Sequence, residues 1–182
     1  MINIRADYVH ADNFIHILSA LMPQNRLALI VSLTTGLRID DVLSLKTQDV
    51  AKQRFTIKEM KTGKRRTIRL SKSLCDELLS QSGRIFVFEH RLDPRKHRTR
   101  QAVFKDLKRA CELFRVSGVH ISPHTARKIY AVGEYKRTCS VKQVQKLLNH
   151  SGEAVTMLYA MADEKTENDR RARRQKLSLP EV

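Results

Sequence analysis

Two different hydrophobic periods follow one another along the chain, and each predicts a different kind of secondary structure. The first apolar side chains recur at helical spacing: Phe14, Ile15, Leu18, Leu21 and Met22. They predict an amphipathic helix over residues 11–22. Residues 27–34 are apolar on nearly every side and predict a buried helix, with Gly36 placed to end it. A further short helix is expected to start near Asp40, whose side chain can cap it.

In the middle of the chain the period changes to two, which is the spacing of strands with one buried face. Residues 54–58 and 67–70 alternate between apolar and polar side chains. Residues 61–64 (Lys-Thr-Gly-Lys) lie between them and predict a hairpin turn. Residues 85–88 predict a third short strand.

Helical periodicity then returns and predicts helices to the end of the patterned region. They cover residues 74–79, residues 99–114, a helix starting at Ser122-Pro123, another after Ser140, and a short one holding Val155, Leu158 and Tyr159. Residues 164–182 form a polar, basic tail. The pattern contains no internal repeat, no linker and no second core.

Composition limits the class of protein. With 182 residues, the chain suits one compact domain. No apolar run is long enough to span a bilayer, and the N-terminus does not resemble a signal peptide, so we expect a cytoplasmic protein with no membrane partner. The three cysteines form no CxxC pair, which predicts reduced thiols and no bound metal.

Charge points to a phosphate-rich partner. The chain has 35 Lys and Arg against 19 Asp and Glu, a formal net charge of +16. Residues 52–72 contain nine basic residues and one acid, and residues 84–109 contain nine basic and three acidic residues. A basic surface tuned for solubility would spread this charge, whereas clustered charge favours binding to nucleic acid.

Several polar residues stand where chemistry is possible, although each has an ordinary structural alternative. Arg38 fits a surface loop, and His150 fits a helix cap. His124 and Arg127 are three residues apart and would share one face of a helix. Tyr159 fits a half-buried position. Their joint order along the chain, more than any single residue, indicates a function.

That order resembles the tyrosine recombinase family of the phage-integrase type. Residues 35–45 (TGLRIDDVLSL) resemble the family's first arginine motif, with Asp41 at the acidic position. The hairpin with Lys61 resembles the strand-turn-strand whose lysine reaches the scissile phosphate. Residues 122–127 (SPHTAR) resemble the His-x-x-Arg box, and residues 144–159 (VQKLLNHSGEAVTMLY) resemble the last box.

The resemblance implies DNA cleavage and rejoining through a 3′-phosphotyrosine. The expected catalytic residues are Arg38, Lys61, His124, Arg127, His150 and Tyr159, with Asp41 in support. The tyrosine would be the nucleophile, and the two arginines would bind the non-bridging phosphate oxygens. The lysine would protonate the leaving 5′-hydroxyl, the first histidine would move the tyrosine's proton, and the second would hydrogen-bond the phosphate. No cofactor is expected.

Other basic residues are expected to contact the DNA backbone: Lys64, Arg65, Arg66, Arg95, Lys96, Arg98 and Arg100. A solvated run of charge is the alternative for all of them. Lys64 is also the rival of Lys61 as general acid. The family's lysine precedes the turn glycine, which favours Lys61.

The resemblance covers residues 10–163 and implies an α+β fold, mainly helical, with a small three-stranded antiparallel sheet at one edge. We expect residues 1–182 to be a single catalytic domain without the family's N-terminal core-binding domain. Double-stranded DNA, a homotetramer on that DNA and accessory DNA-bending proteins are the expected partners. A type IB topoisomerase and a catalytically inactive DNA-binding protein of the same fold are the alternative functions.

Overall fold

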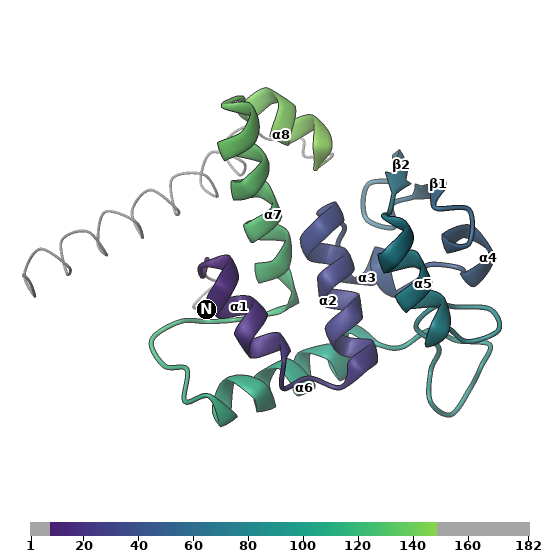
Figure 1. Ribbon diagram of the computed structural model, residues 1–182, viewed down its shortest axis with the longest axis horizontal. Helices are drawn as coiled ribbons and strands as arrows, with labels where there is room; N and C mark the ends of the chain where they lie inside the picture. The colour runs from purple at the N-terminus through teal and green to yellow at the C-terminus, as the bar shows by residue number, and fades with distance from the viewer. Residues whose placement is uncertain (1–7, 149–182) are drawn as a thin grey trace, which may run out of the picture. The chain divides into compact units, whose positions relative to one another are not determined.

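The computed structural model describes residues 8–148, which contain eight helices and two strands (Figure 1). In chain order these are α1 (Ala11–Leu18), α2 (Pro23–Thr35), α3 (Ile39–Leu43), α4 (Thr47–Val50), β1 (Arg54–Lys58), β2 (Arg65–Arg69), α5 (Lys72–Ser80), α6 (Arg100–Leu113), α7 (Pro123–Thr138) and α8 (Val141–Leu147). The chain divides into two compact units, residues 1–130 and 131–182, and the boundary falls inside α7. The predicted mainly helical α+β fold is confirmed.

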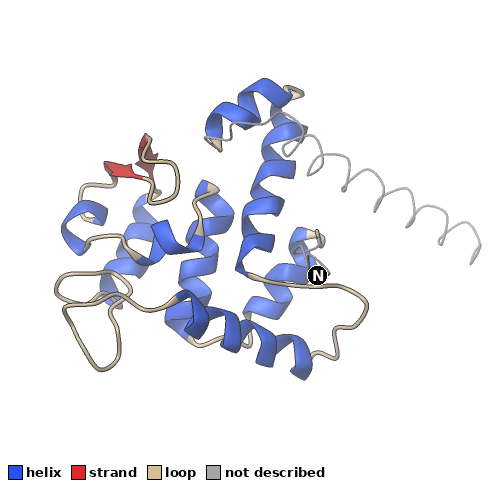
Figure 2. Cartoon of the chain, turned by 180° about the vertical axis from the view of Figure 1, so that it is seen from behind, coloured by secondary structure: helices blue, strands red, loops and turns tan. Residues whose placement is uncertain are grey.

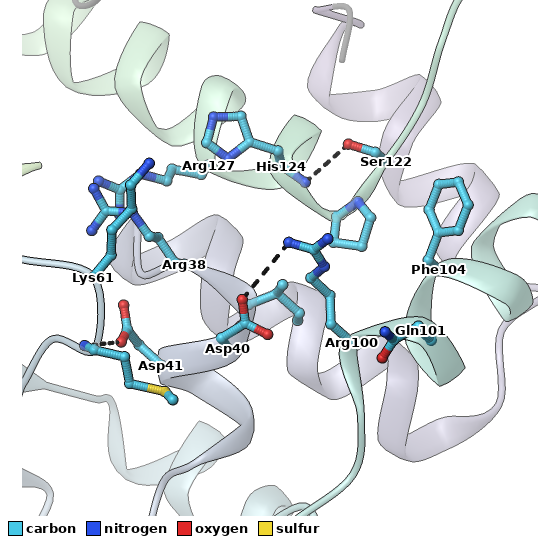
Figure 3. Close-up of a pocket in the computed structure, with 13 residues that line it drawn as sticks. Arg38, Asp40, Asp41, Lys61, Arg100, Gln101, Phe104, Ser122, His124 and Arg127 are labelled. Carbon is cyan, nitrogen blue, oxygen red and sulfur yellow. Dashed lines mark hydrogen bonds and ion pairs between the residues drawn. The ribbon is translucent and has the colours of Figure 1, made fainter. Parts of the chain in front are cut away.

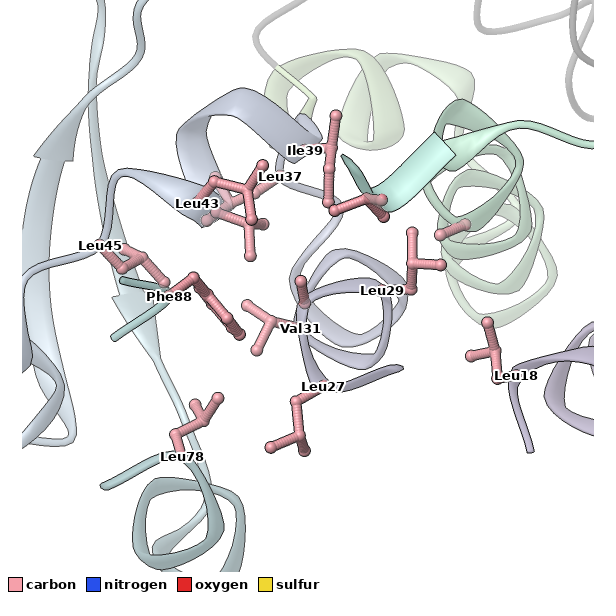
Figure 4. Packing of buried hydrophobic residues seen from close by; sticks show 14 of the residues in the cluster. Leu18, Leu27, Leu29, Val31, Leu37, Ile39, Leu43, Leu45, Leu78 and Phe88 are labelled. Carbon is pink, nitrogen blue, oxygen red and sulfur yellow. The ribbon is translucent and has the colours of Figure 1, made fainter. Parts of the chain in front are cut away.

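Helix α2 is the central element of the core of the first unit. It starts at Pro23, whose fixed φ suits the first helical position and whose missing N–H is not needed there. Leu27, Leu29 and Val31 are almost completely buried, as the all-round apolar pattern predicted. Leu29 and Leu18 lie on one side of the α2 axis, and Val31 and Phe88 lie on the other (Figure 4).

The strands form one antiparallel hairpin, β1-β2, in which Phe55 pairs with Ile68. Both of these side chains are buried, so the predicted alternation is confirmed. Within the described residues the sheet has two strands instead of three (Figure 2). The predicted third strand, residues 85–88, makes only one isolated bridge, between Phe86 and Lys46. Apolar character at 85–88 therefore marks a buried loop, since Val87 and Phe88 are both in the core.

Side-chain caps explain where several helices begin. Ser71 caps α5, Thr99 caps α6 and Ser140 caps α8, each by accepting a hydrogen bond from a backbone N–H in the first turn. Asp40 does not cap α3 as predicted. The cap position is Arg38, which makes no side-chain cap hydrogen bond, and Asp40 lies in the first turn.

In the second unit, the structure describes the end of α7 and α8. Ala131, Val132, Val144 and Leu148 are buried there. The predicted helix around Tyr159 and the basic tail at 164–182 lie outside the described residues. No helix between residues 8 and 148 is both long and apolar enough to cross a membrane.

Gly36 ends α2 in a conformation and a space that only glycine fits. Its φ is +68°, in the left-handed region. A Cβ on this residue would lie 2.3 Å from Cδ1 of the Tyr130 ring, well inside van der Waals contact. The Tyr130 ring therefore packs directly on the backbone of the turn that leads into Arg38.

We expect Gly36→Ala to lower the free energy of unfolding by about 2–4 kcal/mol, because the left-handed strain and the displaced Tyr130 ring add together. Urea denaturation measures this change. Gly118→Ala is the control, since Gly118 has φ +75° and open space around it, and should cost only about 1–2 kcal/mol. Equal losses in the two variants would contradict the role of the ring.

Candidate active site

A pocket of about 580 Å³ opens in the first unit where four segments meet: the start of α3, the β1-β2 turn, the first turns of α6 and the start of α7. Four of the predicted catalytic residues line it, namely Arg38, Lys61, His124 and Arg127. Figure 3 shows the side chains of Arg38, Lys61 and Arg127 directed toward one another. The structure thus brings together residues that are up to 89 positions apart in the sequence.

The start of α7 presents His124 and Arg127 on one face. Pro123 is the first helical residue, and the Ser122 carbonyl accepts a hydrogen bond from the Thr125 N–H at 2.9 Å. The Thr125 hydroxyl in turn accepts from the Ser122 N–H at 3.2 Å. This reciprocal cap fixes the first turn, so the three-residue spacing of His124 and Arg127 places both at the pocket.

Arg127 is completely buried at the wall of the pocket. Its Nη1 donates a hydrogen bond to the carbonyl of Gly36, which joins α7 to the turn before α3. A guanidinium withdrawn from water requires hydrogen bonds and nearby negative charge. The bond to Gly36 also fixes the plane of the donor fork next to Arg38.

Glu59 supplies negative charge beneath the pocket, and sequence reasoning missed it. Its side chain has no exposed surface, and its Oε2 accepts a hydrogen bond from Nη1 of Arg38 at 2.8 Å. Its Oε1 lies 3.8 Å from Nη1 of Arg66. The signal was present in the sequence, because Glu59 is the single acid among the nine bases of residues 52–72.

Asp41, the predicted supporting acid, is buried at the same place. Its Oδ1 accepts a hydrogen bond from the Met60 N–H at 2.8 Å, which ties α3 to the β1-β2 turn. Burial raises the pKa of Asp41, and the negative charge of Glu59 raises it further. The Met60 hydrogen bond and the positive charges of Arg38 and Arg127 act in the opposite direction.

Lys61 and Lys64 occupy different surroundings. Lys61 lines the pocket, whereas Lys64 is exposed and does not belong to the lining. The geometry thus places Lys61, and not Lys64, at the pocket. The remaining predicted catalytic residues, His150 and Tyr159, lie outside the described residues.

Five of the seven predicted DNA-contacting residues are exposed: Lys64, Arg65, Arg95, Lys96 and Arg100. Two of these, Arg95 and Lys96, pair with Asp93 at 3.1 and 3.5 Å. Hydrogen bonds from Arg95 hold the pKa of the Asp93 carboxyl below its usual value. Arg100 also lines the pocket, 3.9 Å from Asp40.

The other two, Arg66 and Arg98, are only partly exposed, and their guanidinium groups bond to other parts of the protein. The Arg66 side chain is only 12% exposed and donates to the carbonyl of Thr35. Arg98 is partly buried and donates to the side-chain oxygen of Gln24. Burial lowers the pKa of both guanidinium groups. Both arginines belong to basic runs of the sequence, which predicted contacts at the surface. In the structure each donates a hydrogen bond to a residue that is distant in the sequence.

Part of the pocket was not anticipated from the sequence. Gln101 and Phe104 project from α6 beside Arg100, and Met60 lies at the turn. Phe104 and Met60 are 37% and 64% exposed, so apolar surface borders the cationic wall. Among the described residues, no group of three or more His, Cys, Asp or Glu is arranged to hold a metal ion.

The comparisons with known proteins agree on one family. Residues 8–166 match the model of the phage integrase family. A probable integrase/recombinase of Bacillus subtilis, YoeC, is 30% identical over 144 residues, covering 75% of this chain and 77% of that protein. The tyrosine recombinase XerA of Pyrococcus furiosus is 28% identical over 145 residues, covering 75% of this chain and 49% of XerA.

The fold is also found in solved structures. A lambda integrase dimer bound to a COC′ core site superposes with a TM-score of 0.74 at 21% identity, covering 88% of this chain and 49% of that one. The chain therefore spans about half the length of several proteins that it matches, and about three quarters of YoeC.

The raised pKa of Asp41 makes the stability of the protein depend on pH. Well below pH 3.8 the carboxyl is protonated in both the folded and unfolded states. As pH rises through its folded pKa, burial opposes ionisation in the folded state only, so stability is lost. The Asp41→Asn variant cannot ionise, so its stability relative to the parent protein should increase as pH rises from well below 3.8 toward neutrality.

Urea denaturation at several pH values measures this difference. Asp40→Asn serves as the control, because it replaces the neighbouring carboxyl with the same amide at a side chain that is 47% exposed. A constant difference between Asp41→Asn and the parent protein across this range would contradict the prediction.

Proposed function

The chain belongs to the phage integrase family, and on that basis we propose that it is a site-specific tyrosine recombinase that cleaves and rejoins DNA through a phosphotyrosine at Tyr159. The observation that supports this most strongly is the meeting of Arg38, Lys61, His124 and Arg127 at one pocket. Side chains from three separate segments point into a space that can hold a phosphodiester group. Unrelated basic residues on a surface would repel one another instead of gathering over buried carboxylates.

The arrangement suits the stabilisation of a pentavalent phosphorus. The forks of Arg38 and Arg127 can donate to the non-bridging oxygens, where negative charge grows during attack. The Tyr159 phenolate oxygen forms a bond to phosphorus as the bond to the 5′-oxygen breaks. Lys61 gives its proton to that oxygen, which leaves as a 5′-hydroxyl, and His124 accepts the proton of the tyrosine.

Rejoining is the reverse reaction with a different strand. A 5′-hydroxyl attacks the phosphotyrosine and gives its proton to Lys61, while the bond from phosphorus to Tyr159 breaks and His124 returns the proton to the tyrosine. The energy of the phosphodiester bond is kept in the protein–DNA bond, so no external energy source is needed. Since His150 precedes Tyr159 by nine residues, we place it on the phosphate as well.

Strand exchange between two duplexes requires several active sites, so we expect a tetramer on double-stranded DNA, with accessory DNA-bending proteins as further partners. The lambda integrase tetramer bound to a Holliday junction is a structural neighbour with this organisation. The exposed Arg65, Arg95 and Lys96 are proposed contacts to the DNA backbone. The cytoplasm, at the nucleoid, is the proposed location.

The test of Tyr159 uses a pool of nicked duplexes with randomised sequence, from which covalently attached DNA is recovered after denaturation. The parent protein should form an adduct that resists denaturant, and Tyr159→Phe should form none while binding the same DNA. Adduct formation by Tyr159→Phe would overturn the assignment of the nucleophile. Failure of the parent protein to attach to any duplex would overturn the enzymatic function and leave a DNA-binding protein. Exchange of strands between recovered duplexes then distinguishes recombination from relaxation of supercoils.

The choice of general acid is tested with Lys61→Ala and Lys64→Ala. We expect Lys61→Ala to reduce the cleavage rate by roughly 10²–10⁴-fold on ordinary DNA, because the leaving alkoxide loses its proton donor. A duplex with sulfur at the 5′-bridging position should restore cleavage, since a thiolate leaves without a proton. Lys64→Ala should change the rate less than about tenfold and weaken DNA binding at higher salt. The reverse pattern would make Lys64 the general acid.

A further inference from the structure

Glu59 lies where the phosphate-binding and proton-donating parts of the site meet. A single oxygen of its carboxylate, Oε2, accepts two hydrogen bonds from two different segments of the chain. One comes from Nη1 of Arg38 at 2.8 Å, and the other comes from the hydroxyl of Thr62 at 3.0 Å. Thr62 is the residue next to Lys61, so one buried atom joins the arginine to the turn that holds the lysine.

The backbone of Glu59 closes the same turn. Its N–H donates to the carbonyl of Lys64 at 2.9 Å, and its own carbonyl accepts from the N–H of Gly63 at 2.8 Å. The Thr62 hydroxyl also accepts from the N–H of Lys64 at 3.4 Å. Main-chain and side-chain bonds together define the turn, and the carboxylate sets how the turn faces Arg38.

Burial makes this connection rigid. Glu59 is 1% exposed, whereas Lys61 in the adjoining turn is exposed and carries a long side chain. A hydrogen bond to a charged group away from water is shorter and stronger than one at the surface. Because the Arg38 guanidinium is planar, holding one Nη also sets the orientation of its remaining N–H groups.

We propose that Glu59 is a positioning residue that couples the two parts of the site, orienting Arg38 toward the phosphate and, through Thr62, orienting the turn that presents Lys61. This inference rests on the proposed recombinase function. This positioning role differs from a purely structural role, in which Glu59 would only neutralise the charges of Arg38 and Arg66. A structural role would alter stability or the amount of active protein, and would affect all DNA substrates equally.

Chemically modified duplexes separate the two roles. The adduct test with the parent protein identifies duplex sequences that are cleaved. These duplexes are then synthesised with one of three groups at the scissile position. The first is an ordinary phosphate. The second has 5′-bridging sulfur, which needs no proton donor. The third is a methylphosphonate, which lacks one charged oxygen and depends less on arginine donors. Lys61→Ala and Arg38→Ala give the reference behaviour for loss of each part.

Thr62→Val removes the hydroxyl that bonds to Glu59 and to the Lys64 N–H, but it keeps the size of the side chain and the bond between Glu59 and Arg38. We expect it to slow cleavage of the ordinary phosphate about tenfold or more, as a misplaced general acid would. The 5′-sulfur duplex should be cleaved at nearly the parent rate, as with Lys61→Ala. Thr67→Val is the matched control, since Thr67 is an exposed residue of β2 that pairs with Thr56, and it should cleave all three duplexes normally.

Glu59→Ala removes both connections. It should reduce cleavage of the ordinary phosphate by roughly 10²-fold or more, and each modified duplex should restore only part of the rate. Glu59→Gln keeps an oxygen acceptor for Arg38 and Thr62 and should stay within about tenfold of the parent rate. If Glu59→Ala fails to fold, Thr62→Val and Glu59→Gln still decide the question.

The proposal would be wrong if Thr62→Val cleaved the phosphate and 5′-sulfur duplexes with equally reduced rates, or cleaved both at the parent rate. Either result would leave the proposed function intact. A folded Glu59→Ala protein that cleaves like the parent would do the same. Absence of cleavage by the parent protein would instead overturn the proposed function, and this inference with it.

Discussion

The arrangement of the first unit depends on burying arginine side chains around one glycine turn. Arg127 is fully buried, and the side chains of Arg38 and Arg66 are 18% and 12% exposed. Guanidinium groups cannot be deprotonated to escape burial, so each must find acceptors and negative charge. The carboxylates of Glu59 and Asp41 and the carbonyls of Thr35 and Gly36 supply them. The cationic pocket is thus built on a framework that already balances positive charge.

The turn between α2 and α3 is where these bonds gather. Arg127 and Arg66 donate to consecutive carbonyls, those of Gly36 and Thr35, and the Tyr130 ring packs on the same backbone. Gly36 makes this possible because it provides both the left-handed φ and the absence of a side chain. The first half of α7 and strand β2 are therefore fixed to Thr35 and Gly36, which Leu37 separates from Arg38, and the geometry of the pocket depends on their shared position.

The hydrophobic periodicity predicted most of the helices and both strands, and the order of the motifs predicted four residues that line the pocket. The errors arose where a structural feature depends on contacts that a local pattern does not contain. The cap Ser140 acts locally, so the sequence indicated directly where α8 begins, whereas the caps Ser71 and Thr99 were not recognised. The predicted strand at 85–88 was wrong, because a short apolar run says only that side chains are buried. Glu59 stood out as the single acid of residues 52–72, but it was missed because that run does not record its partner, Arg38, 21 positions away. Arg66 was assigned to the surface for the same reason.

The bond from Arg127 to Gly36 closes a loop across 91 sequence positions. Contacts between residues so distant in the chain form late during folding, because the entropy of closing the loop must be overcome first. Before that step a nascent chain already carries the positive charges of the pocket but not their arrangement. Completion of the fold is the event that converts a polycation into an ordered pocket.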